Sequence, residues 1–195
     1  MRYEKGHKEA TRRRIVETAA RRFREEGIAA VGVANLMSEI GLTQGGFYNH
    51  FASKEELARE ALALGLEGMR ERMRKARSAT GEVSFERVVD SYLSESHRDN
   101  AGRGCMLTTL AIEAARDNNV VRAQMSDGIA RMIALISATL PESVAPAQRE
   151  SKAMAVVANL IGSMILARAT DDPQVSDRLL EAGRHTASAI VEAAS

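Results

Sequence analysis

The chain has 195 residues and one cysteine, which is enough length for a small head and a larger domain and leaves no partner for an intrachain disulfide. The N-terminal residues lack the apolar stretch of a secretory signal, and the most apolar run, residues 153–167, is too short for a membrane span, so we expect a cytoplasmic protein. The formal net charge is only +1, but residues 1–54 hold ten Lys or Arg against six Asp or Glu, the asymmetry expected when one end of a protein meets phosphate.

Apolar residues recur at helical spacing along nearly the whole chain, and no segment alternates with the period of a strand. This pattern predicts an all-α fold of about nine helices. In chain order the expected helices cover residues 8–26, 33–40, 43–50, 54–76, 84–96, 105–116, 120–140, 146–169 and 176–194. The polar segment 97–104 is expected to be a loop.

Local signals place several of these boundaries. Gly27 is expected to end the first helix, and Gly41 to make a tight turn between the second and third. Ser53 and Glu56 have the spacing of a capping box, which opens a long fourth helix. We predict two domains, a helix-turn-helix domain over 8–54 that continues into the linking helix to about 76, and an effector-sensing and dimerisation domain over 77–195.

The first helix carries charges at the spacing of intrahelical ion pairs. The predicted pairs are Glu17 with Arg21, Arg21 with Glu25, and Arg22 with Glu26. A solvated helix face would explain part of the basic charge of the N-terminal segment equally well.

The segment 32–51 has the chemistry of a DNA-reading helix-turn-helix, because its second helix can lie in the major groove. Thr43 can cap that helix, and Gln44 and Asn49 can bond base edges. Gly45 and Gly46 cost helix stability, about 1 kcal/mol each, so we take the pair as a sign that the backbone approaches DNA closely.

The string TQGGFYNHFASKEEL, residues 43–57, resembles the recognition-helix signature of the TetR (TetR/AcrR-type) family of bacterial transcriptional regulators, and the resemblance covers about residues 8–68. It implies a DNA-binding repressor that is not an enzyme. It also places on DNA, or in the packing of the third helix, the residues Thr43, Gln44, Gly45, Gly46, Phe47, Tyr48, Asn49 and His50, with Tyr48 and Lys54 at phosphate contacts. One departure is Val31-Gly32-Val33, where the family commonly has a capping Thr or Ser at the start of the second helix.

The predicted helix over 146–169 is apolar nearly all round, so it must be covered on two faces. Met154, Val157 and Ile161 mark one side, and Val156 and Leu160 mark another. We expect this helix and the last one to pair with their copies in a homodimer, whose two-fold symmetry would match a palindromic operator.

The helices between the head and this interface are rich in methionine, which adapts to varied apolar shapes. A pocket for an unknown small-molecule effector is one interpretation, and ordinary core filling is the other. The candidate effector residues are Met69, Met73, Tyr92, His97, Thr109 and Asn159, together with Cys105.

Cys105 follows Gly102-Arg103-Gly104 and is expected in the first turn of a helix, where the dipole and Arg103 favour a thiolate. The segment RGCMLTTLAIEAA also resembles a subset of the family, some members of which respond to electrophiles or oxidants through this cysteine. A small buried residue in a tight corner is the alternative.

Rival functions find little support in the residues. The four histidines are scattered and no phosphate loop, metalloprotease motif or nucleophile elbow occurs, so we expect no enzyme, no cofactor and no metal site. A ligand-free DNA-binding activator or architectural protein, independent of the thiol, remains the alternative to an effector-released repressor.

Overall fold

A computed structural model describes residues 5–75, 83–116 and 120–193, without the side chains of Lys5, of 69–75 and of Val120. All regular elements in these ranges are helical: ten α-helices and two short 3₁₀ helices. They are α1 (Lys5–Glu26), α2 (Val33–Glu39), α3 (Gln44–Phe47), α4 (Lys54–Lys75), α5 (Phe85–Tyr92), α6 (Glu95–Asp99), η1 (Ala101–Arg103), α7 (Met106–Arg116), α8 (Val120–Thr139), η2 (Pro146–Gln148), α9 (Arg149–Ala169) and α10 (Pro173–Glu192).

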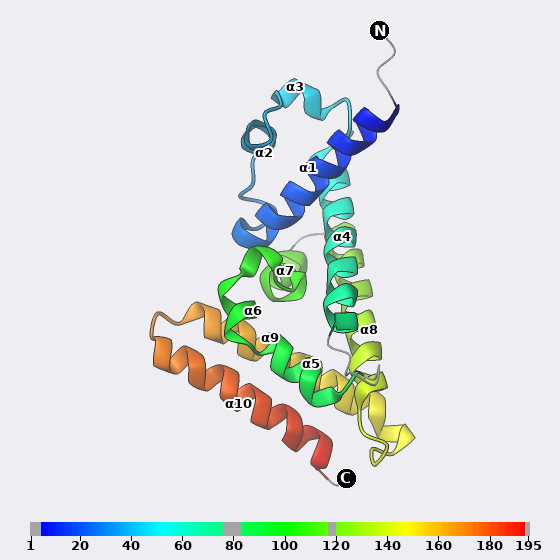
Figure 1. The fold of residues 1–195 in the computed structure, drawn as a ribbon, viewed down its shortest axis with the longest axis vertical. Helices are drawn as coiled ribbons and strands as arrows, with labels where there is room; N and C mark the ends of the chain where they lie inside the picture. The colour runs from blue at the N-terminus through cyan, green and yellow to red at the C-terminus, as the bar shows by residue number, and fades with distance from the viewer. Residues whose placement is uncertain (1–4, 76–82, 117–119, 194–195) are drawn as a thin grey trace.

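The helices form a head and a body (Figure 1). The head, α1–α3, lies at one end of the molecule, and the α9–α10 pair lies at the other. The long α4 runs from the head into the body and packs on α1 and α8. One continuous set of buried apolar side chains extends from the head through α4, α7 and α8 to α9. α4 and α7 therefore each contact both the head and the body.

The all-α prediction is confirmed, but the expected helix over 84–96 is two helices. The Ser94 hydroxyl accepts a hydrogen bond from the backbone N–H of His97 at 3.2 Å and so caps a new helix, α6. The Arg184 guanidinium donates to the carbonyl of Leu93 at 2.6 Å, which satisfies the end of α5. The predicted loop 97–104 accordingly contains the end of α6 and the turn η1.

Several other helix boundaries differ by a few residues from those predicted from the sequence. The helix predicted over 43–50 is α3, which ends at Phe47. The last helix begins at Pro173 rather than near Ser176, because Asp172 accepts hydrogen bonds from the N–H groups of Gln174 and Val175 and proline suits the first helical position. Gly27, with φ +86°, and Gly41, with φ +74°, confirm the predicted helix end and tight turn.

Basic side chains satisfy several helix C-termini in the body. Arg149 donates to the carbonyls of Ser137 and Leu140 at 2.7 Å each, at the end of α8. Lys152 donates to three carbonyls at the end of α10, the shortest at 2.6 Å. These cations complete orphan carbonyls and complement the helix dipoles. Part of the body's positive charge is thus committed to structure.

Among the described residues, one segment, Pro146–Ala169, is long and apolar enough to cross a membrane by length and composition alone, and 33% of its apolar window is buried. Its inner side chains, including Val156, Leu160 and Met164, lie in the protein core against α8 and α10. Val157, predicted on the other side with Met154, is also buried, whereas Met154 is exposed. Core packing accounts for the buried part of this apolar surface.

Candidate nucleic-acid interface

Aromatic residues build the core of the head. Phe47 at the end of α3 stacks on Phe51, with ring centroids 5.4 Å apart, and both are 1% exposed. The Arg12 guanidinium covers the Phe51 ring at 4.0 Å and pairs with Glu56 and Glu60 of α4. α1, α3 and α4 are thereby joined around one aromatic pair.

The two helices of the motif begin differently. At the start of α2, Gly32 provides no side-chain hydrogen bond, which confirms the expected absence of a cap. At the start of α3, the Thr43 hydroxyl accepts from the N–H of Gly46 at 3.3 Å. The remaining N-terminal amides of α3 are left for solvent or for an anion.

α3 and the turn after it present a polar surface to solvent. Thr43, Gln44, Gly45, Tyr48 and Asn49 are exposed, and the Tyr48 side chain is 64% exposed although it is aromatic. A Cβ at Gly45 would meet no neighbour, so this position is open toward the outside.

Gly46 and Phe47 belong to the inner side of the same helix. A Cβ at Gly46 would lie 3.8 Å from Cε of Met37, an ordinary contact. Phe47 is buried, so its side chain holds α3 on the head and is not available at the surface. Of the glycine pair, only Gly45 has the geometry of a surface that another molecule can approach.

His50 lies half-buried behind α3. Its Nδ1 is buried and makes no hydrogen bond to another described residue. Burial lowers the pKa of His50 from its ordinary value, and the charges of Lys8 and Arg12 lower it further. The imidazole is therefore neutral at pH 7 in the free protein.

The start of α4 is tied to the loop between α1 and α2. Lys54 donates from Nζ to the carbonyl oxygen of Ala29 at 3.3 Å. The capping box is confirmed, with Ser53 Oγ accepting from the N–H of Glu56 at 3.2 Å, and the Glu56 carboxylate accepting from Ala52 at 2.7 Å. The hydrogen bond from Ala52, followed by that from Arg12, lowers the pKa of Glu56.

One predicted ion pair of α1 has a different partner. Glu17 pairs with Arg13 at 2.8 Å, whereas Arg21 pairs with Glu25 and with Glu39 of α2. The predicted pair of Arg22 with Glu26 is present, and Arg22 also reaches Glu39 at 3.0 Å. These bridges hold α2 against α1, which the linear spacing could not reveal.

Three predicted effector residues meet at the junction of α5, α6 and α7. Cys105 directly precedes α7 and is 3% exposed. The backbone N–H of Cys105 donates to Nε2 of His97 at 3.0 Å, and Nδ1 of His97 donates to the Tyr92 carbonyl at 2.6 Å. Because both ring nitrogens are engaged in this way, His97 is neutral and serves as a cap of α7.

Arg168 completes this junction and was missed by sequence reasoning. From the last turn of α9, its guanidinium donates to the Thr108 hydroxyl at 2.9 Å and to the carbonyls of His97 and Arg98. Burial lowers the pKa of Arg168, an effect partly offset by Tyr92, Cys105 and Asp99. An arginine more than sixty residues downstream carries no local signal of such a role.

The other candidate effector residues lie apart from this junction. Thr109, one turn into α7, bonds the carbonyl of Met106 at 3.3 Å. Asn159 faces α10 and donates to the carbonyl of Gly183 at 2.7 Å. The side chains of Met69 and Met73 lie outside the described residues.

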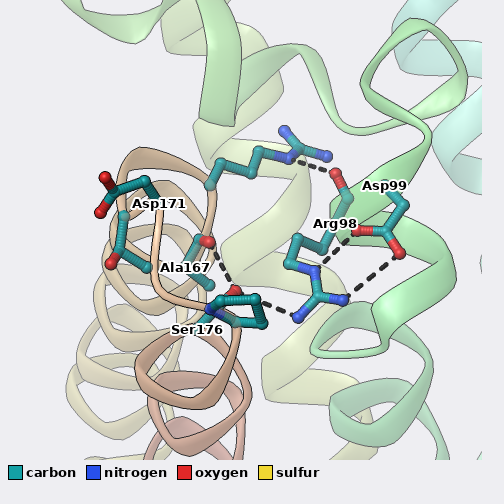
Figure 2. Close-up of a pocket in the computed structure, with 8 residues that line it drawn as sticks. Arg98, Asp99, Ala167, Asp171 and Ser176 are labelled. Atoms are coloured by element: carbon teal, nitrogen blue, oxygen red, sulfur yellow. Dashed lines mark hydrogen bonds and ion pairs between the residues drawn. The ribbon is translucent and has the colours of Figure 1, made fainter.

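A hollow of about 310 Å³ opens where α6 meets the ends of α9 and α10 (Figure 2). Within it, Arg98 pairs with Asp99 at 2.7 Å and donates to the Ser176 hydroxyl at 3.0 Å. Ser176 in turn donates to the Ala167 carbonyl at 2.6 Å. This hollow is a polar joint between helices.

A second hollow, of about 350 Å³, lies between α1, α4 and α8. Its carboxylates are also paired, Glu60 with Arg12 and Asp127 with Arg131, the latter at 2.9 Å. Leu64 and Leu66 supply apolar walls. Its position places the head, the linking helix and the body around one concave surface.

A two-helix motif whose second helix is capped, exposed and polar, carried on a larger helical body, is typical of a helix-turn-helix transcriptional regulator. Comparison with known proteins assigns the family: the profile of bacterial regulatory proteins of the TetR family matches residues 15–61, and that of the C-terminal domain of LmrA/YxaF-like transcriptional regulators matches residues 83–185. The chain belongs to the TetR family, which is a family of regulators and not of enzymes.

Individual relatives agree with this assignment. The uncharacterised regulator YfiR of Bacillus subtilis is 31% identical over 91 residues, which are 47% of this chain and 43% of YfiR. The repressor DhaR of a Mycobacterium species is 26% identical over 116 residues, 58% of this chain and 57% of DhaR. The chain thus spans about half the length of these relatives.

Solved structures share the fold over nearly the whole chain. A TetR regulator from Chloroflexus aurantiacus has a TM-score of 0.77 at 25% identity, covering 95% of this chain and 96% of that one. The reduced form of NemR from E. coli has a TM-score of 0.75 at 21% identity, covering 92% and 96%. At this level of identity, the similarity to NemR shows a shared fold only.

Proposed function

We propose that this protein is a transcriptional repressor that binds a palindromic operator as a homodimer and is released by an effector. The observation that carries the proposal is the exposed, Thr43-capped α3, with its polar side chains directed away from an aromatic core. Relatives named as repressors, DhaR and KstR2 of mycobacteria, support repression rather than activation.

The contacts to DNA are proposed as follows. Gln44 and Asn49 read base edges, Gly45 lets the backbone of α3 approach the groove, and Thr43 with the first amides of α3 receives a phosphate. Tyr48 and Lys54 hold phosphates on either side, and His50 supports them from behind. Gly46 and Phe47 act inside the head, where they keep α3 in place.

The dimer is proposed to form through α9 and α10. The outer face of α9 exposes Met154 and Leu166, and no residue lies within 4 Å of a Cβ at Gly162 between them. Small residues at a helix face allow close approach, and apolar residues provide the driving force. A second copy would cover this face by a two-fold axis and place two heads side by side.

In this proposal residues 8–54 form the DNA-binding domain, and residues 77–195 form the domain that senses the effector and dimerises. The helix that ends at about residue 76 links the two domains. An effector that favours one arrangement of the body changes the tilt of α4 and the separation of the heads, and a differential affinity of about 1–3 kcal/mol is enough to release DNA. Its site of action is the cytoplasm, where operator DNA is found.

DNA selected from a random pool by the full chain tests this function. We expect a palindromic consensus that binds the purified protein with nanomolar affinity at moderate salt. Gln44→Ala is expected to lower affinity for the consensus about tenfold and to relax the preference at one base pair. Lys54→Met is expected to weaken all sequences alike and to reduce the slope of log affinity against log salt by about one.

Failure to enrich any sequence would contradict DNA recognition. A consensus without two-fold symmetry would contradict the dimeric arrangement. Occupancy of the selected site upstream of a reporter gene should lower expression, and raised expression would identify an activator instead.

The effector is proposed to be either a small molecule or an electrophile or oxidant that modifies Cys105. The thiol lies in the junction with His97 and Arg168, so a substituent on sulfur would displace the start of α7. Its burial means that a reagent reaches the sulfur only when this junction opens.

Cys105→Ser is expected to abolish derepression by N-ethylmaleimide or hydrogen peroxide while operator affinity stays within about twofold of wild type. The measurement is operator binding by fluorescence anisotropy with and without reagent. Release of the serine variant from operator DNA by the same reagents would contradict regulation through the thiol. Regulation by a small molecule would then remain, and Thr109→Val and Asn159→Ala would test it.

A further inference from the structure

Glu113 on α7 binds the backbone of the loop that joins α1 to α2. Its Oε2 accepts from the N–H of Ile28 at 2.9 Å, and its Oε1 accepts from the N–H of Ala29 at 2.6 Å. Each carboxylate oxygen thus takes one amide, across more than eighty residues of chain. A charged acceptor makes these bonds stronger than neutral ones.

The loop is shaped to receive this carboxylate. Gly27 ends α1 with φ +86°, a conformation that side chains disfavour, and a Cβ there would lie 3.2 Å from Oε2 of Glu113. At its far end the loop enters α2 at Gly32, which has no side chain to cap the helix. The entry to α2 is therefore held from the body by Glu113 and lacks a cap of its own.

The same loop residue also contacts the proposed phosphate anchor. The N–H of Ala29 donates to Glu113, and the carbonyl of Ala29 accepts from Lys54 Nζ at 3.3 Å. An ammonium group has three donors, so two remain for a phosphate. A line of hydrogen bonds thus runs from α7 through Ala29 to the first residue of α4.

A second contact holds the same side of the head to the body. Arg24 of α1 donates from Nε to the carbonyl of Gly102 at 2.7 Å. Gly102 lies in η1, and the start of α7 follows three residues after η1 ends. Any displacement of α7 along its axis would therefore act on the loop at Glu113 and on the end of α1.

We propose that Glu113 is a positioning residue for operator recognition, which fixes the loop before α2 and, through Ala29, the direction of Lys54. The proposal rests on the DNA-binding function above. It adds a defined joint through which the body controls the head, in parallel with the covalent link of α4.

Glu113→Gln tests the joint with little change of size. Glutamine offers one acceptor oxygen where two N–H groups need acceptors, and its amide group would face the other N–H. We expect operator affinity to fall about tenfold and the salt slope to fall by up to one, as when Lys54 loses its phosphate. Amide hydrogen exchange in residues 27–32 should rise severalfold at the same time.

A double-mutant cycle separates positioning from a general structural effect. If Glu113 acts through Lys54, Glu113→Gln should cost clearly less affinity in a Lys54→Met background than in wild type. Glu86→Gln, which removes an exposed carboxylate from α5, is the matched control and should change neither affinity nor exchange. Thermal unfolding of each variant shows that binding is measured on folded protein.

Equal losses of affinity in both backgrounds would overturn the proposal and leave Glu113 as a structural contact. Unchanged operator binding and unchanged hydrogen exchange in Glu113→Gln would also overturn it. If the wild-type chain selects no DNA at all, the proposed function fails. Hydrogen exchange at Ile28 and Ala29 then still decides whether the carboxylate holds the loop.

Discussion

Replacing Phe47 with alanine is expected to unfold the head and to abolish operator binding. The side chain is 1% exposed and stacks on Phe51 in the core of the head. Truncating a buried phenylalanine costs about 3–5 kcal/mol, a large share of the 5–15 kcal/mol that stabilises a typical domain. Urea denaturation followed by circular dichroism, with hydrogen exchange of α2 and α3, measures the loss.

Tyr48→Ala provides the matched comparison, because the neighbouring aromatic side chain is exposed. We expect its stability to stay within about 1 kcal/mol of wild type while DNA affinity falls, since the proposed phosphate contact would be lost. A Phe47→Ala protein as stable as Tyr48→Ala would contradict the aromatic core of the head. A Tyr48→Ala protein with full affinity would remove Tyr48 from the interface.

The head was predictable because its signals are local. Gly27 and Gly41 take the left-handed conformations that their positions required, Thr43 caps α3, and Ser53 with Glu56 opens α4. Each of these features depends on residues within four positions of one another, so spacing along the chain determines them.

The joints of the body depend on residues far apart, and the sequence alone did not reveal them. Arg184 ends α5 from α10, Arg168 connects α9 with α6 and α7, and Glu113 reaches the loop before α2. Nothing near these residues distinguishes them from solvated charges on a helix face. The break at Ser94 was missed for the same reason, because a distant arginine satisfies the carbonyl left by the end of α5.

The contacts around Cys105 bear on its two interpretations, a reactive thiol and a small buried residue. His97 is held neutral by two backbone hydrogen bonds, so it has no free nitrogen to accept the thiol proton. Arg168 lies in the same junction, where its guanidinium donates to the Thr108 hydroxyl and to the carbonyls of His97 and Arg98. Arg168 is therefore a residue to vary alongside Cys105, together with the predicted Arg103.

Replacing Leu166 with arginine is expected to convert the protein to a monomer at micromolar concentration. Leu166 is 55% exposed on the outer face of α9, twelve residues and about 18 Å from Met154, which is 47% exposed. In a two-fold interface the substitution places a charge on each side, so the desolvation penalty is paid twice. Sedimentation velocity measures the change of mass.

Operator binding should follow the change of mass. A monomer binds only one half-site, so affinity for the full palindrome is expected to fall at least about a hundredfold, while affinity for an isolated half-site is unchanged. Leu64→Arg on α4 is the control, because Leu64 is 40% exposed and lies outside the proposed α9–α10 interface. A dimeric Leu166→Arg protein, or a monomeric Leu64→Arg protein, would contradict an interface through α9 and α10. If the interface is there, the single Leu166 side chain controls dimer formation and therefore the binding of both half-sites.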